Sequence, residues 1–392
     1  MIMIRGGRVI TRDGLRLADV VVEGEVVVGL GSARPMEGSN VIDASGCLVG
    51  PGFVDLHTHL RDPGQTWKED LLSGSRAAAA GGFTAVTAMP NTDPPLDDPK
   101  LVADVAERGA EIGLVEVAVA ATVTMGRAGE ELAPLDELYE AGARVFTDDG
   151  DPVASPALLA AALRRLRELP GALVAQHAEP EVEMVRRDLA VVTETGGRYH
   201  CQHVSTSETL ELIAEARRAG LEVTAEVTPH HLSFDRELAE PGNPNFKMYP
   251  PLRSAEDREA LVAGLADGAI DVVATDHAPH TDEEKGLGWE EAPRGVIGLE
   301  TAAAAVWEAL GDPARLFTVL SSEPARIAGL TDQGRPLREG GAANIVVFDP
   351  RMSWVPGRFA SRSANSPYRG RPMRGMAVAT VHRGRVTHRA GR

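Results

Sequence analysis

The sequence contains few cysteines and no long apolar run. Its 392 residues include two cysteines, Cys47 and Cys201, which are too few for a disulfide framework and point to a reducing compartment. No uninterrupted apolar stretch approaches the roughly 20 residues of a membrane span. No charged-then-apolar leader stands at Met1–Gly6 either, as a secretory signal would require. These absences together predict a soluble, cytoplasmic protein that does not bind a membrane.

Positive charge is also scarce. Lys and Arg number 40 against 57 Asp and Glu, which gives a formal net charge of −17. Binding to nucleic acid depends on Lys and Arg that neutralise phosphates, so this balance argues against nucleic acid as a partner. The chain is 43% hydrophobic and 25% charged, which is typical of an ordinary globular protein.

The two ends of the chain share one texture. Residues 1–50 are rich in Val and Ile and are broken by Gly and Asp, as in "ADVVVEGEVVVGLG", a pattern typical of short strands. The same texture returns near the C-terminus in "GGAANIVVFDP" and "VATVHRGRVTHRAG". We therefore predict a small β-sandwich domain formed by residues 1–50 and 335–392, which flanks a different central domain at residues 51–334.

The central part alternates short apolar strands with alanine-rich helical stretches. Eight continuous apolar strands, each followed by a helix or a long loop, are typical of a (β/α)8 barrel. An open doubly wound sheet is the alternative, but no G-x-G-x-x-G loop follows the first strand. The predicted strands are Phe53–His57, Thr84–Ala88, Val115–Ala121, Arg144–Thr147, Leu173–Gln176, Tyr199–Gln202, Val223–Val227 and Asp271–Ala274.

Polar residues gather at the ends of these strands, where a barrel places its catalytic side chains. Seven of the eight strand ends carry a residue that could bind a metal or donate a hydrogen bond. They are His57 and His59, Asn91, the pair Asp148 and Asp149, His177, His203, the pair His230 and His231, and Asp276 with His277 and His280.

A metal site is the interpretation that this distribution favours. Taken alone, His57 and His59 at i and i+2 are more often structural or surface residues, and a lone His177 or His203 is more often a satisfied core histidine. The complete set, with Asp276, makes coincidence a poor explanation, and neutral imidazoles with carboxylates suit catalytic zinc. One aspartate of the Asp148–Asp149 pair should face inward. We expect His230 and His231 to shape a loop and Cys201 to be a buried bystander.

An ordered series of motifs now resembles the amidohydrolase superfamily and, more narrowly, the bacterial class I dihydroorotases. The series is "PGFVDLHTHLRDPG", "AMPNT", "FTDDG", "QHAE", "HVSTSETL", "EVTPHHL", "PPLR", "ATDHAPH" and "GLET". The resemblance covers essentially the whole chain. It implies reversible opening of the dihydroorotate ring to N-carbamoyl-L-aspartate, a step of pyrimidine biosynthesis.

The resemblance also implies which residues carry this chemistry. Asp149 takes the place of the carbamylated lysine of other branches and would bridge two zinc ions. Arg61, Asn91 and His280 would recognise the substrate carboxylate, and the backbone at Pro293 and Gly295 would contact the substrate. The implied metal ligands are His57, His59, Asp149, His177, His203 and Asp276.

Two roles follow from general chemistry once the family is accepted. Arg61 continues the alternation of His57 and His59, so its fork could reach the same cavity and hold a carboxylate. Zinc would lower the pKa of a water molecule, and Asp276 would accept its proton and deliver it to the departing nitrogen. The resemblance implies a homodimer acting on a small molecule. Association with aspartate transcarbamoylase is left open, and co-purification would show it.

The sequence departs from the family pattern at two places. Tyr249 stands before "PPLR", where relatives commonly carry an Asn that contacts substrate. The connection from His177 to His203 is shorter than the family norm, which indicates either a true deletion or a disordered loop missing from the sequence; we favour the missing loop. The segment from Glu283 to Thr301 is either a substrate-contacting loop or a plain solvent loop.

Two other functions remain alternatives at this point. One is a different cyclic amidase, such as a hydantoinase, dihydropyrimidinase or allantoinase, although these usually rely on the lysine that strand 4 lacks here. The other is an inactive dihydroorotase-like scaffold subunit of aspartate transcarbamoylase, although such homologues lose metal ligands and this chain has every one.

Overall fold

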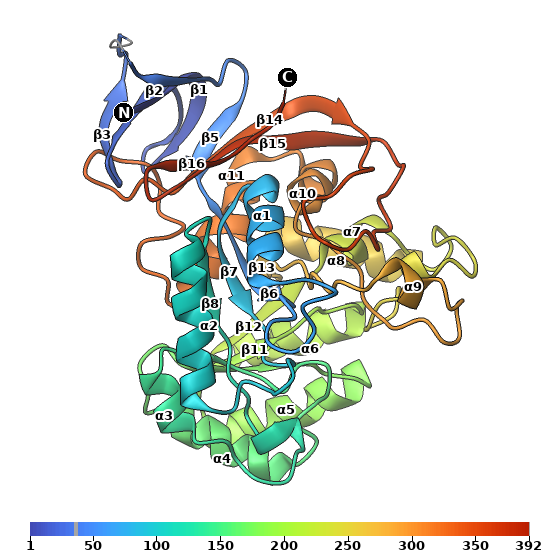
Figure 1. Ribbon diagram of the computed structural model, residues 1–392. Coiled ribbons are helices and arrows are strands. Elements are labelled where there is room, and N and C mark those ends of the chain that lie inside the picture. The colour runs from blue at the N-terminus through green and yellow to red at the C-terminus, as the bar shows by residue number, and fades with distance from the viewer. Residues whose placement is uncertain (35–37, 392) are drawn as a thin grey trace.

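Strands from both ends of the chain form one mixed sheet. The computed structural model describes residues 1–34 and 38–391. The sheet has the order β16-β15-β14-β5-β1-β2-β3, with β4 also paired to β1, and lies at the top of Figure 1. Its strands are β1 (Ile2–Thr11), β2 (Gly14–Glu23), β3 (Val26–Gly31), β4 (Asn40–Asp43), β5 (Leu48–Pro51), β14 (Ile345–Trp354), β15 (Met373–His382) and β16 (Arg385–Arg389).

The eight predicted barrel strands all form, within the predicted limits or one residue beyond them. They pair in parallel as β6-β7-β8 and as β13-β12-β11-β10-β9. Isolated parallel bridges, Ala121 with Phe146 and Thr58 with His277, link the two groups at both edges. The strands are β6 (Phe53–Thr58), β7 (Phe83–Ala88), β8 (Glu116–Val119), β9 (Val145–Phe146), β10 (Leu173–Gln176), β11 (Tyr199–Cys201), β12 (Val223–Val227) and β13 (Val272–Val273).

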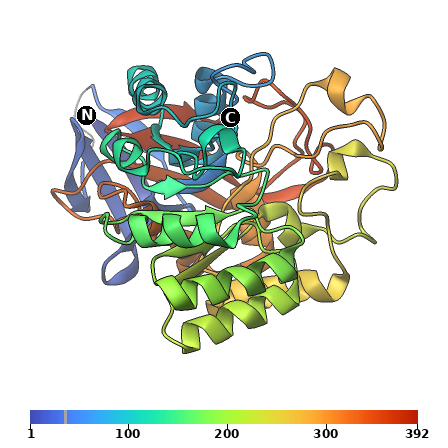
Figure 2. The same cartoon turned by 90° about the horizontal axis from the view of Figure 1, so that it is seen from below.

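Helices follow the strands and surround them. On one side α4 packs on α5, α5 on α6, and α6 on α8, and Figure 2 shows these green and yellow helices side by side. The predicted barrel architecture is thereby confirmed. The helices are α1 (Leu71–Gly81), α2 (Pro99–Ile112), α3 (Leu135–Glu140), α4 (Pro156–Leu166), α5 (Glu181–Thr195), α6 (Ser207–Arg218), α7 (Pro229–Ser233), α8 (Ala255–Asp267), α9 (Asp282–Lys285), α10 (Ala302–Leu310), α11 (Pro313–Phe317) and α12 (Glu323–Ala328), with the 3-10 helices η1 (Met125–Arg127) and η2 (Pro244–Phe246) and the π-helix η3 (Thr318–Ser322).

The helix after β6 illustrates how local sequence sets these boundaries. The side chain of Asp70 accepts a hydrogen bond from Ser73 N and caps the start of α1, because the first N–H groups of a helix lack partners within it. Gly82 ends the helix with φ 92°, a left-handed conformation that glycine adopts without strain. Between these caps the alanines at 77, 78 and 79 are buried, which lets the helix lie close to the barrel.

The sheet of the two termini packs against the barrel. Thr380 Oγ1 of β15 donates a hydrogen bond to Ala79 O of α1 at 2.7 Å. The ring centroids of Trp307 (α10) and Phe348 (β14) lie 5.9 Å apart. The segment between β14 and β15 also returns to the barrel, where Asn365 Nδ2 donates to Ala278 O. The division into domains at residues 50 and 335 stays a prediction. Across the described residues we find no helix long and apolar enough to cross a membrane.

Candidate metal centre and substrate pocket

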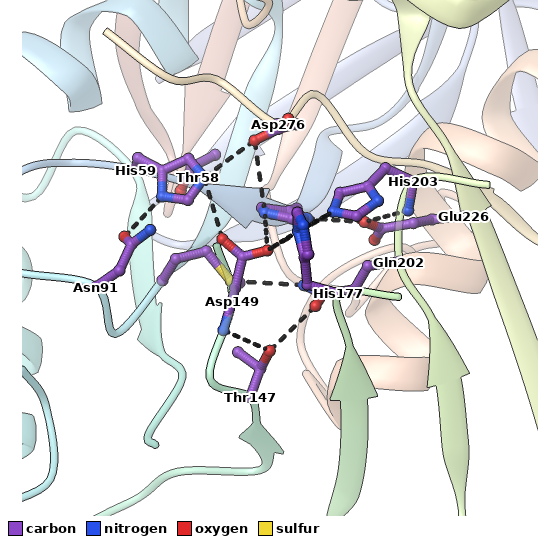
Figure 3. A network of polar contacts seen from close by, with 12 residues as sticks. Thr58, His59, Asn91, Thr147, Asp149, His177, Gln202, His203, Glu226 and Asp276 are labelled. Atoms are coloured by element: carbon purple, nitrogen blue, oxygen red, sulfur yellow. Dashed lines mark hydrogen bonds and ion pairs between the residues drawn. The ribbon is translucent and has the colours of Figure 1, made fainter. Parts of the chain in front are cut away.

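The six predicted metal ligands lie together at the ends of the barrel strands. They follow or end β6, β9, β10, β11 and β13, and Figure 3 shows Asp149 among His59, His177, His203 and Asp276. Each of the six residues is at most 7% exposed. The structure therefore brings into one buried cluster side chains that are far apart in the sequence.

Asp149 lies at the centre of this cluster. Its Oδ1 is 3.3 Å from His57 Nε2, 3.5 Å from His177 Nδ1 and 3.7 Å from His203 Nε2. Its Oδ2 is 3.4 Å from His59 Nε2. One carboxylate thus faces four imidazoles with its two oxygens turned to different histidines, which is the arrangement needed to join two cation sites.

Asp276 completes the side of the cluster next to His59. Its Oδ1 lies 2.9 Å from His59 Nε2 and 3.5 Å from His57 Nε2. Two sets of three residues each have potential ligand atoms that all lie within 4.8 Å of one another. One set is His57, His59 and Asp276, and the other is His57, Asp149 and His203. Either group could hold a metal ion.

Two atoms at the centre show that a cation fits this cluster. His57 Nε2 and Asp149 Oδ1 face each other, are fully buried, and make no hydrogen bond. Buried polar atoms are rarely left unsatisfied, and imidazole nitrogen with carboxylate oxygen is a common ligand set for divalent metals. The residues present therefore fit a divalent metal ion.

Hydrogen bonds to the Nδ1 atoms of His57 and His59 fix which ring nitrogen of each faces the cluster. His57 Nδ1 lies 2.8 Å from Glu226 Oε1, and an ionised carboxylate can only accept, so Nδ1 carries the proton and Nε2 is free to bind a metal. Glu226 also accepts from His203 N at 3.1 Å and pairs with His200 Nε2 at 3.0 Å. His59 Nδ1 lies 2.8 Å from Asn91 Oδ1, so Asn91 orients a ligand of the cluster as well as lining the pocket.

The structure distinguishes the two neighbouring aspartates. Asp148 accepts hydrogen bonds from Val123 N at 2.9 Å and from Thr124 N and Oγ1 at 3.1 and 2.5 Å. Its side chain is therefore engaged in holding a loop, whereas Asp149 faces the histidines. Arg127 donates to the backbone carbonyl oxygens of both aspartates, at 3.1 and 2.7 Å, and so fixes the turn that carries them.

The charges in the cluster support one another despite their burial. Burial disfavours the imidazolium of His57, but Asp149, Glu226 and Asp276 outweigh it and raise its pKa well above the usual range. Burial would likewise raise the pKa of Asp149, but His57 and the hydrogen-bonding histidines hold it well below its usual value. The pKa of Glu226 falls to about 2, because His57 and His200 outweigh burial. The carboxylates are therefore ionised, and a metal ion bound at His57 Nε2 would take the place of a proton on that nitrogen.

Several residues of the site have backbone conformations that residues other than glycine rarely adopt. Among the described residues other than glycine, five have positive φ, and three of these are predicted site residues: Arg61 at 59°, His203 at 32° and Asp276 at 45°. A fourth, Arg127 at 58°, holds the Asp149 turn. Such conformations cost about 1–3 kcal/mol each and persist where the surrounding structure imposes them.

Arg61 faces a cavity of about 360 Å³ that the metal cluster also lines. It is 9% exposed, and within the described residues no carboxylate forms an ion pair with it and its Nε has no hydrogen-bond partner. Burial lowers its pKa to about 10, and Asp276 and Asp149 oppose that shift. β6 ends at Thr58, so Arg61 reaches the cavity through a left-handed turn and not by continuing the strand. A buried, unpaired cation is suited to an anionic ligand.

The remaining predicted substrate contacts are partly engaged within the protein. His280 lines the cavity, and its Nε2 lies 2.8 Å from Arg294 O, which makes Nε2 the protonated nitrogen. Burial and the cations Arg61, Lys68 and Lys285 lower the pKa of His280 to about 3. Gly295 lines the cavity, and a Cβ there would lie 2.7 Å from that of Ala278. The carbonyl of Pro293 accepts from Lys285 Nζ at 2.9 Å.

Some residues near the site differ from the sequence analysis or extend it. Glu226 and Arg294 were not predicted; a charged residue inside the otherwise apolar strand "VTAEV" was the available signal for Glu226, since buried charges are almost always paired. His231 is hydrogen-bonded to Thr228 Oγ1 and Pro250 O at 2.8 and 3.2 Å, as expected for a loop-shaping residue. Cys201 is fully buried in the apolar core, and its pKa is raised well above the usual range by burial.

Between His177 and α5 the chain has only Ala178, Glu179 and Pro180. The chain thus runs from His177 into α5 with only these three residues between them. Whether the short connection is a deletion or reflects a missing loop stays a prediction.

Comparison with known proteins places these observations in a family. The model of the amidohydrolase family matches residues 48–386. A dihydroorotase of Mycobacterium leprae is 41% identical over 408 aligned residues, which cover 95% of both chains. A dihydroorotase of Anaeromyxobacter dehalogenans is 41% identical over 432, covering 100% of this chain and 99% of the relative. The alignment is longer than this chain, so that relative has positions that this chain lacks.

A solved structure shares the same architecture. The L-hydantoinase of Arthrobacter aurescens superposes with a TM-score of 0.89 at 26% identity, covering 100% of this chain and 96% of the hydantoinase. A family model that matches most of the chain, full-length relatives at 41% identity and this structural similarity lead to one conclusion: the chain belongs to the amidohydrolase family.

Proposed function

We propose that this protein is a dihydroorotase, which reversibly hydrolyses the cyclic amide of dihydroorotate to N-carbamoyl-L-aspartate in pyrimidine biosynthesis. Relatives of that name, 41% identical over nearly the whole chain, support this proposal. The observation that carries it is Arg61, a buried cation without a carboxylate partner among the described residues, beside a cluster of six metal-competent side chains. Dihydroorotate has both an amide to hydrolyse and a carboxylate to neutralise such a cation.

We propose zinc as the metal, with two ions held by His57, His59, Asp149, His177, His203 and Asp276. Asp149 would lie between the two ions, because its two oxygens face different histidines. When bound, zinc supplies Lewis acidity, which activates water at neutral pH and polarises a carbonyl oxygen. Glu226 and Asn91 would orient His57 and His59 through their Nδ1 atoms.

The protein's own groups would then divide the work on the substrate. Asp276 lines the cavity and its pKa lies below the usual range, since His57 and His59 outweigh burial; an ionised carboxylate can accept the proton of the attacking water. It would return that proton to the ring nitrogen as the amide C–N bond breaks. Arg61 would hold the substrate carboxylate with its fork, and Asn91, His280 and the backbone at Gly295 and Pro293 would orient the ring.

Removal of metal is the first test. Protein stripped of zinc by a chelator should lose activity on dihydroorotate and regain it when zinc is restored. Asp276→Asn should lower kcat by about 10³-fold or more while zinc content, measured by mass spectrometry, stays near two per chain. Near-normal turnover in that variant would remove Asp276 from its role, and activity in metal-free protein would remove the metal mechanism.

A substrate panel distinguishes the second candidate function. The fold is shared with a hydantoinase at a TM-score of 0.89, so hydantoin, dihydrouracil and allantoin should be assayed beside dihydroorotate. If Arg61 binds the substrate carboxylate, kcat/KM should be highest for dihydroorotate, the substrate with a ring carboxylate. A higher value for hydantoin or dihydrouracil would replace the proposed function with that of another cyclic amidase.

The setting of the enzyme is also proposed. We expect a homodimer in the cytoplasm, which light scattering and fractionation of cells would test. Co-purification with aspartate transcarbamoylase would establish an association, and full dihydroorotase activity of the isolated chain would exclude a purely scaffolding role.

A further inference from the structure

A second cavity adjoins the catalytic one. It has a volume of about 450 Å³ and is lined largely by apolar side chains, among them Phe246, Met248, Leu252 and Trp289. Tyr249 and Arg294 line this cavity and the catalytic cavity as well. These two residues therefore form a partition between a polar, metal-lined cavity and an apolar one.

Arg294 stacks on Tyr249, and the Tyr249 ring lies beside a histidine of the metal cluster. The guanidinium of Arg294 lies 4.1 Å from the ring centroid of Tyr249, at cation–π distance. The centroid of the Tyr249 ring in turn lies 4.9 Å from that of the His177 ring, at an interplanar angle of 37°. Within the described residues Arg294 has no ion pair, although its side chain is exposed in an acidic protein. Its charge is thus available to a ligand.

The backbone on both sides of the partition is tied together. Lys247 Nζ donates to Trp289 O at 2.6 Å and to Ala292 O at 2.7 Å. Lys285 Nζ donates to Pro244 O and to Pro293 O, both at 2.9 Å.

A backbone bond, from Gly295 N to Lys247 O at 2.8 Å, adds a third tie. The segments that carry Tyr249 and Arg294 are thereby fixed to each other independently of the two partition side chains. Removing those side chains should therefore join the cavities without moving the loops.

We propose that the Tyr249–Arg294 partition determines substrate specificity: it confines the site to small, anionic cyclic amides and closes the apolar cavity to bulky substituents. This inference rests on the proposed function. The tyrosine ring occupies the passage, and the arginine favours a carboxylate while opposing an uncharged aromatic group that would have to displace it from the ring. A cyclic amide with an aromatic substituent, such as 5-benzylhydantoin, has the chemistry that the apolar cavity would take.

The test compares two substrates on variants of the partition. Arg294→Ala, Tyr249→Ala and the double variant are assayed with dihydroorotate and with 5-benzylhydantoin. The ratio of kcat/KM for benzylhydantoin to that for dihydroorotate should rise about 10-fold in each single variant and about 100-fold in the double variant, as expected for opening a hydrophobic pocket. Arg236→Ala is the matched control, because Arg236 is also exposed and lines only the apolar cavity; it should leave the ratio unchanged.

A merely structural role would not move this ratio. If the variants lose both activities equally, or lose zinc in proportion, the partition does not select substrates. Wild-type hydrolysis of benzylhydantoin at a kcat/KM equal to that of dihydroorotate would also overturn the proposal.

Calorimetry separates this inference from the proposed function. Zinc-loaded double variant should bind 5-benzylhydantoin at least about 10-fold more tightly than wild type, whether or not either protein turns over dihydroorotate. An unchanged affinity for 5-benzylhydantoin would overturn the proposed role of the partition. A wild-type protein that is inactive on dihydroorotate would overturn only the proposed function.

Discussion

The pocket has two sides of different construction. On the ligand side, six side chains at strand ends are at most 7% exposed, and His57 and His59 have second partners that fix their rings. On the loop side, Tyr249 is half-buried and Arg294 is exposed, and their segments are held by hydrogen bonds from the ammonium groups of Lys247 and Lys285 to backbone carbonyl oxygens. The barrel strands thus position the chemistry, while loops position the groups that would select the substrate. Changes on the ligand side should affect all substrates alike, and changes on the loop side should affect them differently.

The largest effect is expected at the centre of the ligand side. Asp149→Asn removes the anion that faces four histidines, so zinc content should fall and kcat should drop by about 10³-fold or more for every substrate. Metal analysis and single-turnover assays measure this. Asp148→Asn is the control, since that side chain holds only the Thr124 loop, and it should retain zinc. A fully metallated, active Asp149→Asn protein would contradict the central role.

The next effect tests whether second partners matter as much as ligands. Glu226→Gln should weaken zinc affinity by about 10- to 100-fold, because glutamine cannot accept from both His57 and His200 with full charge. At saturating zinc its activity should largely return. Competition with a coloured chelator measures the affinity, and Glu222→Gln, an exposed neighbour on the same segment, should be silent. Equal zinc affinities in the Glu226→Gln and Glu222→Gln proteins would show that Glu226 does not contribute to metal binding.

A change at Arg61 should discriminate between substrates. Arg61→Gln removes the buried cation, so KM for dihydroorotate should rise by about 10- to 100-fold, the value of a charge-assisted bond, with zinc content unchanged. Dihydrouracil lacks the ring carboxylate, and its kinetics should be unaffected. Parallel losses on both substrates would place Arg61 with the ligand side of the comparison.

The smallest effect concerns stability, in the segment that follows Arg294 in the chain. Glu300 accepts hydrogen bonds from Ala360 N at 2.9 Å and Ser361 N at 3.2 Å, and burial raises its pKa to about 7. The native protein therefore keeps this proton up to about pH 7, whereas the unfolded chain releases it near pH 4.5. Its contribution to stability is present at low pH and is lost as pH rises from about 4.5 to 7.

Glu300→Gln should remove that slope, a difference of about 2–3 kcal/mol across this pH window. Urea unfolding of wild type and variant between pH 5 and 8, at the same zinc occupancy, measures it as a difference between the two proteins. Identical slopes would show that Glu300 is ionised in the folded protein throughout this range.

The sequence predicted the ligand side better than the loop side, for physical reasons. Barrel strands are local apolar runs, and the ends of parallel strands meet at one face, so His57, His177 and Asp276 could be placed together without coordinates. Asp148 and Asp149 could not be told apart by spacing alone. The deciding contacts come from Thr124, a residue on another segment.

The loop side depends on contacts that leave no local pattern. Arg294 was not predicted, because its stacking on Tyr249 joins two irregular segments 45 positions apart. Arg61 was expected to extend the alternation of a strand, but β6 ends at Thr58 and a left-handed backbone turns the side chain inward. Alternation describes strands and does not extend into the loop that follows.

The strained backbone at Arg61, His203 and Asp276 has a consequence for how such a protein can change over generations. At about 1–3 kcal/mol each, these three conformations reduce folding stability by an amount that is large beside the 5–15 kcal/mol of a typical domain. A copy released from selection for catalysis could recover that stability by exchanging these residues for glycine or by relaxing the loops. Loss of activity would then be favoured by folding itself, and a non-catalytic descendant would be expected to be more stable than its parent.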